Sequence, residues 1–143
     1  MATTKVLLVD DEVEFVETLA ERLRTRGMAV EVATSGPQAV ERADARAFDA
    51  VVLDLAMPGM DGIATLKKLL AKKPDLQVML LTGQATVKSA VEATNLGALD
   101  VLEKPTDIET LMEKIGQAQT KTEALGERRV QEMIEKVLLT RGV

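Results

Sequence analysis

Short apolar segments alternate five times with amphipathic segments, and this alternation limits the possible folds more than any other feature of the sequence. The apolar segments predict buried strands, and the amphipathic segments repeat apolar residues at helical spacing. The expected strands are residues 5–9, 28–33, 48–53, 76–81 and 99–102. Alternating strands and helices form a parallel sheet covered on both faces, and right-handed crossovers favour a doubly wound sandwich. We therefore predict an α/β fold with a five-stranded parallel sheet and five flanking helices.

Capping and stop residues delimit the expected helices. Ser35, Asp61 and Thr86 each precede an amphipathic segment and are expected to cap the second, third and fourth helices. Gly27 and Gly97 follow the first and fourth helices, at positions where glycine commonly ends a helix. These signals place each helix between two of the predicted strands.

The C-terminal part of the chain predicts a helical extension. The fifth helix is expected to begin near residue 106 or 107 and to continue to Leu125, where Gly126 should interrupt it. Residues 127–141 carry a second amphipathic stripe, which either packs back on the domain or forms a homodimer through the C-terminal helices. We predict a domain over residues 1–120 and a helical extension over residues 121–143, with no output domain.

The composition excludes several kinds of site. The 143 residues include no cysteine and no histidine, which excludes disulfides, thiolate metal sites and His-dependent triads. Any bound metal must then be a hard cation held by oxygen. The net charge of −5 and the presence of only two phenylalanines as aromatic residues argue against direct nucleic-acid binding. Because no membrane-spanning run or signal peptide is present, we expect no membrane association and a cytoplasmic location.

Polar side chains stand at the ends of four expected strands. Asp10 and Asp11 follow the first strand, Asp54 follows the third, Thr82 follows the fourth, and Lys104 follows the fifth. The carboxyl ends of parallel strands lie at one edge of the sheet, and ligands bind there where the strand order reverses. If the first, third, fourth and fifth strands are neighbours, these groups converge in one crevice.

These residue types suit phosphoryl transfer. Closely spaced carboxylates repel one another, and Mg²⁺ can neutralise them while keeping positions for phosphoryl oxygens. One carboxylate can then act as a nucleophile toward phosphorus. A lysine supplies a compact positive charge, and a threonine hydroxyl can donate a hydrogen bond to a phosphoryl oxygen. The set therefore indicates formation of an aspartyl phosphate.

Four motifs together resemble the receiver domain of two-component response regulators. They are Asp10-Asp11, the run LDLAMPGMDG at residues 53–62, Leu81-Thr82-Gly83, and the run GALDVLEKP at residues 97–105. The resemblance covers residues 4 to 120 approximately, and residues 82–105 are most similar to receivers of the nitrogen-regulatory type. It implies a flavodoxin-like, receiver-like sheet with the strand order 2-1-3-4-5.

The resemblance also implies a function in a phosphorelay. Asp54 would be the phosphoacceptor, receiving phosphate from a histidine kinase or a phosphotransfer protein. The metal ion, Mg²⁺ or Mn²⁺, would be held by Asp10, Asp11, Asp54 and the backbone carbonyl of Ala56. Lys104 would contact the phosphoryl group. The protein would catalyse its own phosphorylation and dephosphorylation without being a turnover enzyme.

Switching in this family implies further roles for residues near the fifth strand. Thr82 would move toward the phosphoryl group and reshape the face formed by the fourth helix, fifth strand and fifth helix, which would control a downstream protein partner. Pro105 would follow a cis peptide bond. Val101 departs from the family pattern, which usually has Tyr or Phe at this switch position. Because valine has one stiff rotamer and no ring, the aromatic part of the switch cannot operate as usual.

Other interpretations stay open at this point. Haloacid-dehalogenase-type phosphatases also use an aspartate after the first strand with Mg²⁺, although they carry Asp-x-Asp where this chain has Asp10-Asp11-Glu12. Phosphorylation of Asp10 rather than Asp54 would identify such an enzyme. A third interpretation is a receiver-shaped interaction module that is never phosphorylated. The chain is also either a receiver acting alone or the receiver part of a longer protein.

Overall fold

The computed structural model describes residues 3–55, 61–83 and 87–140, and over these residues five strands alternate with five helices. The strands are β1 (Lys5–Val9), β2 (Ala29–Ala33), β3 (Ala50–Leu53), β4 (Val78–Thr82) and β5 (Asp100–Glu103). The helices are α1 (Val13–Thr25), α2 (Gly36–Ala45), α3 (Gly62–Lys72), α4 (Val87–Asn95) and α5 (Ile108–Thr140). The predicted alternation is confirmed.

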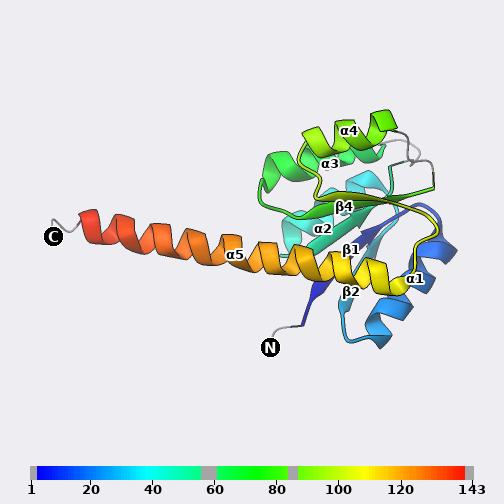
Figure 1. Ribbon diagram of the computed structural model, residues 1–143, viewed down its shortest axis with the longest axis horizontal. Coiled ribbons are helices and arrows are strands. Elements are labelled where there is room, and N and C mark those ends of the chain that lie inside the picture. The colour runs from blue at the N-terminus through cyan, green and yellow to red at the C-terminus, as the bar shows by residue number, and fades with distance from the viewer. Residues whose placement is uncertain (1–2, 56–60, 84–86, 141–143) are drawn as a thin grey trace.

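The strands form one parallel sheet with the order β2-β1-β3-β4-β5 (Figure 1). This order makes β1, β3, β4 and β5 neighbours, as the predicted crevice requires. The register pairs Val9 with Leu53 and Thr82 with Glu103, so the strands end close to the same level. The residues that follow β1, β3 and β5 therefore meet at one edge of the sheet.

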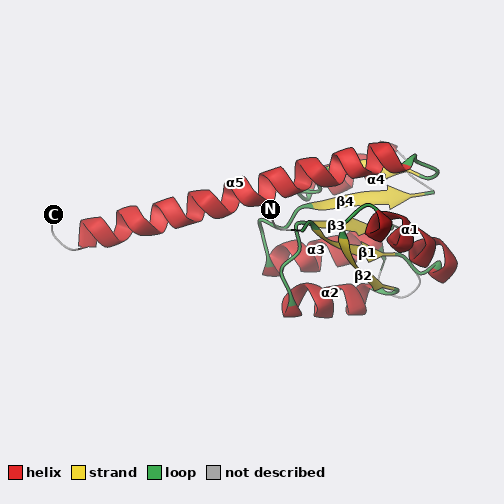
Figure 2. Cartoon of the chain, turned by 90° about the horizontal axis from the view of Figure 1, so that it is seen from below, coloured by secondary structure: helices red, strands yellow, loops and turns green. Residues whose placement is uncertain are grey.

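Apolar layers cover both faces of the sheet. Successive strand residues point to opposite faces, so Leu7 and Leu53 pack toward α2, α3 and α4, whereas Leu8 and Leu81 pack toward α1 and α5. Figure 2 shows the sheet between α5 on one side and the pair α2 and α3 on the other. Fully burying one such leucine stabilises the fold by about 1.5–3 kcal/mol. The sheet is thus a rigid support for the residues at its edge.

Helix starts and ends agree with the predicted signals. The Ser35 hydroxyl accepts a hydrogen bond from the Gln38 amide at 3.3 Å, and the Asp61 carboxylate accepts one from the Ala64 amide at 2.8 Å. Gly27, which follows α1, has a φ of +91°, a conformation that glycine adopts without steric cost. The predicted cap Thr86 lies outside the described residues.

The predicted interruption of the last helix at Gly126 is wrong, because α5 runs without a break to Thr140. A glycine inside a helix costs only about 1 kcal/mol, which is too little to end a helix whose first half is buried against the sheet. Before the glycine, the Thr122 hydroxyl donates to the Asp49 carbonyl at 2.9 Å. After it, the Arg129 guanidinium pairs with Asp75 in the loop before β4.

The end of α5 projects away from the rest of the molecule (Figures 1 and 2). Every described residue from 127 onward is exposed. The exposed apolar side chains include Val130, Met133, Ile134, Val137 and Leu138, each at least 48% exposed. The interpretation that this stripe packs back on the domain is therefore wrong, and the domain boundary at residue 120 stays a prediction.

Candidate functional site

Four elements bring the predicted polar groups to the carboxyl edge of the sheet. Asp10 directly follows β1, Asp54 follows β3, Thr82 ends β4, and Lys104 follows β5. Backbone hydrogen bonds fix these ends, because the Asp54 amide donates to the Val9 carbonyl at 2.9 Å and the Lys104 amide donates to the Thr82 carbonyl at 2.9 Å. The sheet thus sets the relative positions of the side chains.

Lys104 connects the acidic groups of the site. Its Nζ lies 2.6 Å from Asp10 Oδ2, 3.2 Å from Glu12 Oε1 and 3.9 Å from Asp54 Oδ2. The side chains of Asp10 and Asp54 are each only 5% exposed, and that of Lys104 is 14% exposed. Water screens the charges of Asp10 and Asp54 poorly, whereas the Glu12 side chain is 64% exposed. One lysine beside two buried carboxylates and a third at the surface leaves a net negative charge at the site.

The surroundings shift the protonation of both members of the shortest pair. Burial raises the pKa of Asp10 above its usual range, although the Lys104 and Glu12 hydrogen bonds act in the opposite direction. Burial alone would lower the pKa of Lys104, but the hydrogen bond and charge of Asp10, together with the charge of Asp54, outweigh it and raise that pKa. Lys104 is therefore a permanent cation in the physiological range.

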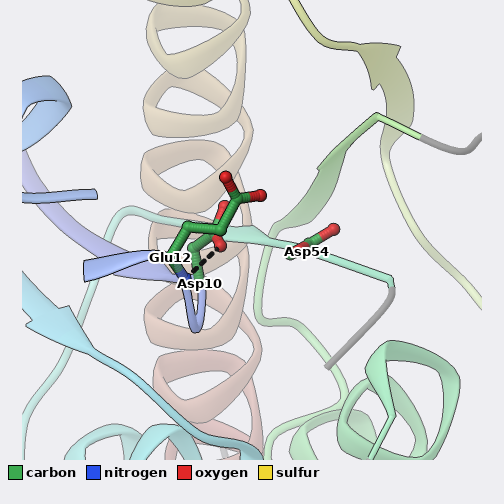
Figure 3. A group of neighbouring side chains, drawn as sticks. All are labelled: Asp10, Glu12 and Asp54. Carbon is green, nitrogen blue, oxygen red and sulfur yellow. Dashed lines mark hydrogen bonds between the residues drawn. The ribbon is translucent and has the colours of Figure 1, made fainter. Parts of the chain in front are cut away.

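Three carboxylates form the described group that is close enough to hold a metal ion. Oxygens of Asp10, Glu12 and Asp54 all lie within 4.8 Å of one another (Figure 3). The Glu12 amide donates to Asp10 Oδ1 at 2.9 Å, so the chain folds back just after β1 and carries the Glu12 carboxylate to the site. Asp11, a predicted ligand, is not in this group, and Ala56 lies outside the described residues.

Glu12 was not among the predicted site residues. The motif consists of two adjacent aspartates, Asp10 and Asp11. The turn after β1 instead places Asp10 and Glu12, the first and third of three consecutive acidic residues, at the site. Its only signal in the sequence was the run Asp10-Asp11-Glu12 itself. The choice between Asp11 and Glu12 depends on the backbone turn, which residue types alone do not specify.

The remaining predicted residues lie around β4 and β5. Thr82 is 1% exposed at the end of β4. Val101 is half-buried and packs against the apolar cluster on the α2, α3 and α4 side of the sheet. The Lys104–Pro105 peptide bond is cis. Thr82 and the Lys104–Pro105 bond thus lie at the carboxyl ends of β4 and β5, whereas Val101 lies within β5.

Gly62 allows α3 to begin directly against the strand end that carries Asp54. Its amide donates to the Leu55 carbonyl at 2.7 Å. A Cβ at this position would overlap the Leu55 backbone and the Asp54 carbonyl oxygen. Gly62 therefore permits a close backbone approach that fixes the main chain of the central aspartate.

Comparison with known proteins finds one family over most of the chain. Residues 6–116 match the family described as "Response regulator receiver domain". The transcriptional regulatory protein ZraR of Escherichia coli K12 is 40% identical over 120 residues, which cover 84% of this chain and 27% of ZraR. The C4-dicarboxylate transport transcriptional regulatory protein DctD of Rhizobium meliloti is 33% identical over 128 residues, which cover 90% of this chain and 28% of DctD.

A solved structure shares the same architecture. The CheY-like receiver domain protein of Methanospirillum hungatei JF-1 superposes with a TM-score of 0.82 at 25% identity, covering 86% of this chain and 98% of that protein. It is matched along nearly its whole length, whereas the chain spans only about a quarter of ZraR and DctD.

These relatives correct the prediction that the protein's partners do not include nucleic acid. ZraR and DctD are both transcriptional regulatory proteins, so the family includes proteins that act on transcription. The prediction rested on the net charge and aromatic content of a chain that covers only about a quarter of those relatives. The net charge and aromatic content describe this chain alone.

None of the described helices is both long enough and apolar enough to cross a membrane.

Proposed function

The chain belongs to the response regulator receiver domain family of two-component signalling, and on that basis we propose that it accepts a phosphoryl group on Asp54. Its relatives ZraR and DctD agree with the predicted similarity to nitrogen-regulatory receivers, which is confirmed. The observation that carries the proposal is the convergence of Asp10, Asp54 and Lys104 at the carboxyl ends of β1, β3 and β5, along one edge of the sheet.

In the proposed reaction, an Asp54 carboxylate oxygen attacks the phosphorus of a phosphohistidine on a histidine kinase or phosphotransfer protein. The O–P bond forms as the P–N bond breaks, and the imidazole nitrogen leaves with the electron pair and takes up a proton from solvent. The Lys104 ammonium, 3.9 Å from Asp54 Oδ2, is placed to offset the charge of the phosphoryl oxygens. Positioning and charge compensation are the main requirements of such a transfer.

The donor set fits a hard divalent cation. Asp10, Glu12 and Asp54 offer only oxygen ligands, and burial of two of them leaves their negative charge without solvent compensation. We assign Asp10 and Asp54 to Mg²⁺ or Mn²⁺ binding with Glu12 beside them, and Asp11 and the Ala56 carbonyl stay predicted ligands. When bound, the cation would offset negative charge on the phosphoryl group and orient it.

The consequence of phosphorylation is proposed to be a shift between two packings. The Thr82 hydroxyl would donate a hydrogen bond to a phosphoryl oxygen, which would reshape the face formed by α4, β5 and α5 toward a protein target. Val101 would make no aromatic contribution to this shift.

The protein modifies itself and later hydrolyses its own aspartyl phosphate, so we propose that it is not a turnover enzyme. A cytoplasmic location stays a prediction.

Intact-mass measurement after incubation with acetyl phosphate tests the proposal. We expect one added phosphoryl group on the wild type with Mg²⁺, and none in the presence of a chelator or on Asp54→Asn. The matched control is Asp44→Asn, which removes another aspartate paired with a lysine, Lys72 at 2.6 Å, on the exposed surface. This control should be phosphorylated like the wild type.

The other outcomes separate the alternatives. A phosphoryl group that persists on Asp54→Asn and is lost on Asp10→Asn would overturn the proposal in favour of a phosphatase-like nucleophile at Asp10. No addition to the wild type, from acetyl phosphate or from a phosphorylated histidine kinase, would leave a receiver-shaped interaction module.

A further inference from the structure

An aromatic ring contacts the lysine of the site. The Nζ of Lys104 lies over the ring of Phe15, 4.2 Å from its centroid, and the same nitrogen pairs with Asp10 and Glu12. This distance is well within the range in which the negative face of an aromatic ring attracts a cation. The contact joins α1 to the residue that follows β5, and neither the sequence motifs nor the proposed chemistry uses it.

The position of Phe15 suits a role in holding the lysine. The ring is half-buried near the start of α1 and packs against the apolar cluster between α1, α5 and the sheet. With Leu8, Val52 and Leu81 it lines a small space next to Asp10 and Asp54. Phe15 also lines a surface hollow of about 390 Å³ that includes Pro105. The residue thus borders both the space next to the acidic site and that hollow.

We propose that Phe15 is a positioning residue for Lys104: its ring restricts the ammonium group to the mouth of the carboxylate cluster, next to Asp54. A lysine has a flexible four-carbon stem and a compact charge, so carboxylates alone leave its direction poorly defined. A ring that attracts the cation favours the conformers directed at the site. The attraction is strengthened because the Lys104 side chain is only 14% exposed.

The inference rests on the proposed function for its catalytic consequence, whereas the contact itself joins two described side chains of this protein. If Lys104 is to meet a phosphoryl group on Asp54, a lysine already held 3.9 Å from Asp54 Oδ2 needs little rearrangement. Loss of the ring would let the lysine sample other directions, including the hollow beside Pro105. Phosphorylation would then slow without loss of the acceptor.

The contact is tested first on the protein without metal or phosphodonor. In the wild type, the ring current of Phe15 should shift the NMR signals of the Lys104 ε-methylene group upfield. Phe15→Leu should abolish the shift, Phe15→Tyr should keep it, and Phe48→Leu should leave it unchanged. Phe48 is a matched control because it is the other aromatic residue and belongs to the core cluster on the opposite face.

A double-mutant cycle measures the strength of the same contact. The unfolding equilibrium constants of wild type, Phe15→Leu, Lys104→Met and the double variant should show a coupling of about 2- to 10-fold. The unpaired carboxylates left by Lys104→Met occur in both arms of the cycle and cancel. Absence of coupling, together with an unshifted Lys104 ε-methylene signal, would overturn the proposal.

Phosphorylation kinetics then test the positioning role. The time course of intact mass with acetyl phosphate and Mg²⁺ should be about 3- to 10-fold slower for Phe15→Leu, with the same final addition on Asp54. Phe15→Tyr should restore the rate, and Phe48→Leu should keep it despite its lower stability. Wild-type rates in Phe15→Leu, or rates that follow thermal stability across all variants, would overturn the positioning role.

If the wild type accepts no phosphoryl group, the proposed function fails, while the NMR shift and the double-mutant cycle still decide whether Phe15 positions Lys104.

Discussion

At the scale of single residues, the Asp10 carboxyl group is subject to opposing influences on its pKa. Burial raises this pKa, and hydrogen bonds from Lys104 and the Glu12 amide act against the shift without cancelling it. Only the deprotonated carboxylate binds a divalent cation well, so proton and metal compete at this position. The burial that concentrates charge for the metal also makes Asp10 easier to protonate.

We predict that Mg²⁺ affinity falls on acidification at a higher pH than for an ordinary aspartate site. Because the pKa of Asp10 is raised above the usual 3.8, its protonated form persists to higher pH and excludes the cation there. Titration calorimetry at a series of pH values measures this dependence, since the chain has no tryptophan or tyrosine for a fluorescence assay. Asp10→Asn should bind weakly at every pH. Constant wild-type affinity down to the usual aspartate range would contradict the prediction.

Gly62 is a second residue whose role depends on its surroundings. We predict that Gly62→Ala lowers the free energy of unfolding by about 1–3 kcal/mol, because the new methyl group would overlap the Leu55 backbone and the Asp54 carbonyl. It should also slow phosphorylation by displacing the Asp54 main chain. Urea unfolding followed by circular dichroism, with intact-mass kinetics on the same samples, measures both effects. A fully stable and fully reactive variant would show that the α3 start can move away at no cost.

At the scale of elements, α5 behaves as one helix with two different environments. Its first half buries Ile108, Leu111, Ile115 and Ala118 against the sheet, and its second half has no buried residue in the described part of the chain. Gly126 lies between these halves. The helix passes through it because helix propensity is a weak preference, which the buried contacts of the first half of α5 override.

We predict that Gly126→Ala stabilises the protein by about 0.5–1 kcal/mol. An alanine loses less backbone entropy than glycine when the helix forms, and apart from the adjoining residues and backbone of α5 itself no described atom lies within 4 Å of the position that its Cβ would take. Urea unfolding and the helical circular dichroism signal measure the gain. Gly62→Ala is the opposite control, since the same substitution there meets backbone atoms. A loss of stability in Gly126→Ala would mean that the helix needs a flexible point at this residue.

At the scale of the whole molecule, stability should come from the part of the chain before residue 127. We predict that removing residues 127–143 changes the free energy of unfolding by no more than about 1 kcal/mol. Two described ion pairs are lost with them, Arg128–Glu132 within the removed segment and Arg129–Asp75. The side chains of both pairs are exposed, so solvent screens them. Phosphorylation should be unaffected because the site lies at the opposite end of the sheet from the Arg129–Asp75 pair.

The matched control is a substitution inside the part of α5 that packs on the sheet. Ile115→Ala should cost about 2–5 kcal/mol, because Ile115 is fully buried and its truncation leaves a cavity. Urea unfolding of both variants makes the comparison. A large loss on removing residues 127–143 would show that the projecting half of α5 is part of the cooperative unit.

Much of the fold was predictable because it depends on local patterns. Apolar β-branched segments and 3–4 spacing specify strands and helices, and Ser35 and Asp61 cap helices through bonds that span only three residues. The convergence of Asp10, Asp54 and Lys104 followed from the position of each at a strand end in a parallel sheet. The strand order itself came from the resemblance to a known family.

The set of elements and the edge at which the polar groups gather could therefore be inferred from the residues alone, since both follow from periodicity and chain direction. In contrast, the turn after β1 sets the direction of each acidic side chain, and the folded chain alone shows that Glu12 rather than Asp11 joins Asp10 and Asp54. Folding also brought Phe15 onto Lys104, a contact between residues far apart in the chain. The continuation of α5 through Gly126 also depends on tertiary structure, because the buried contacts of its first half outweigh a local preference.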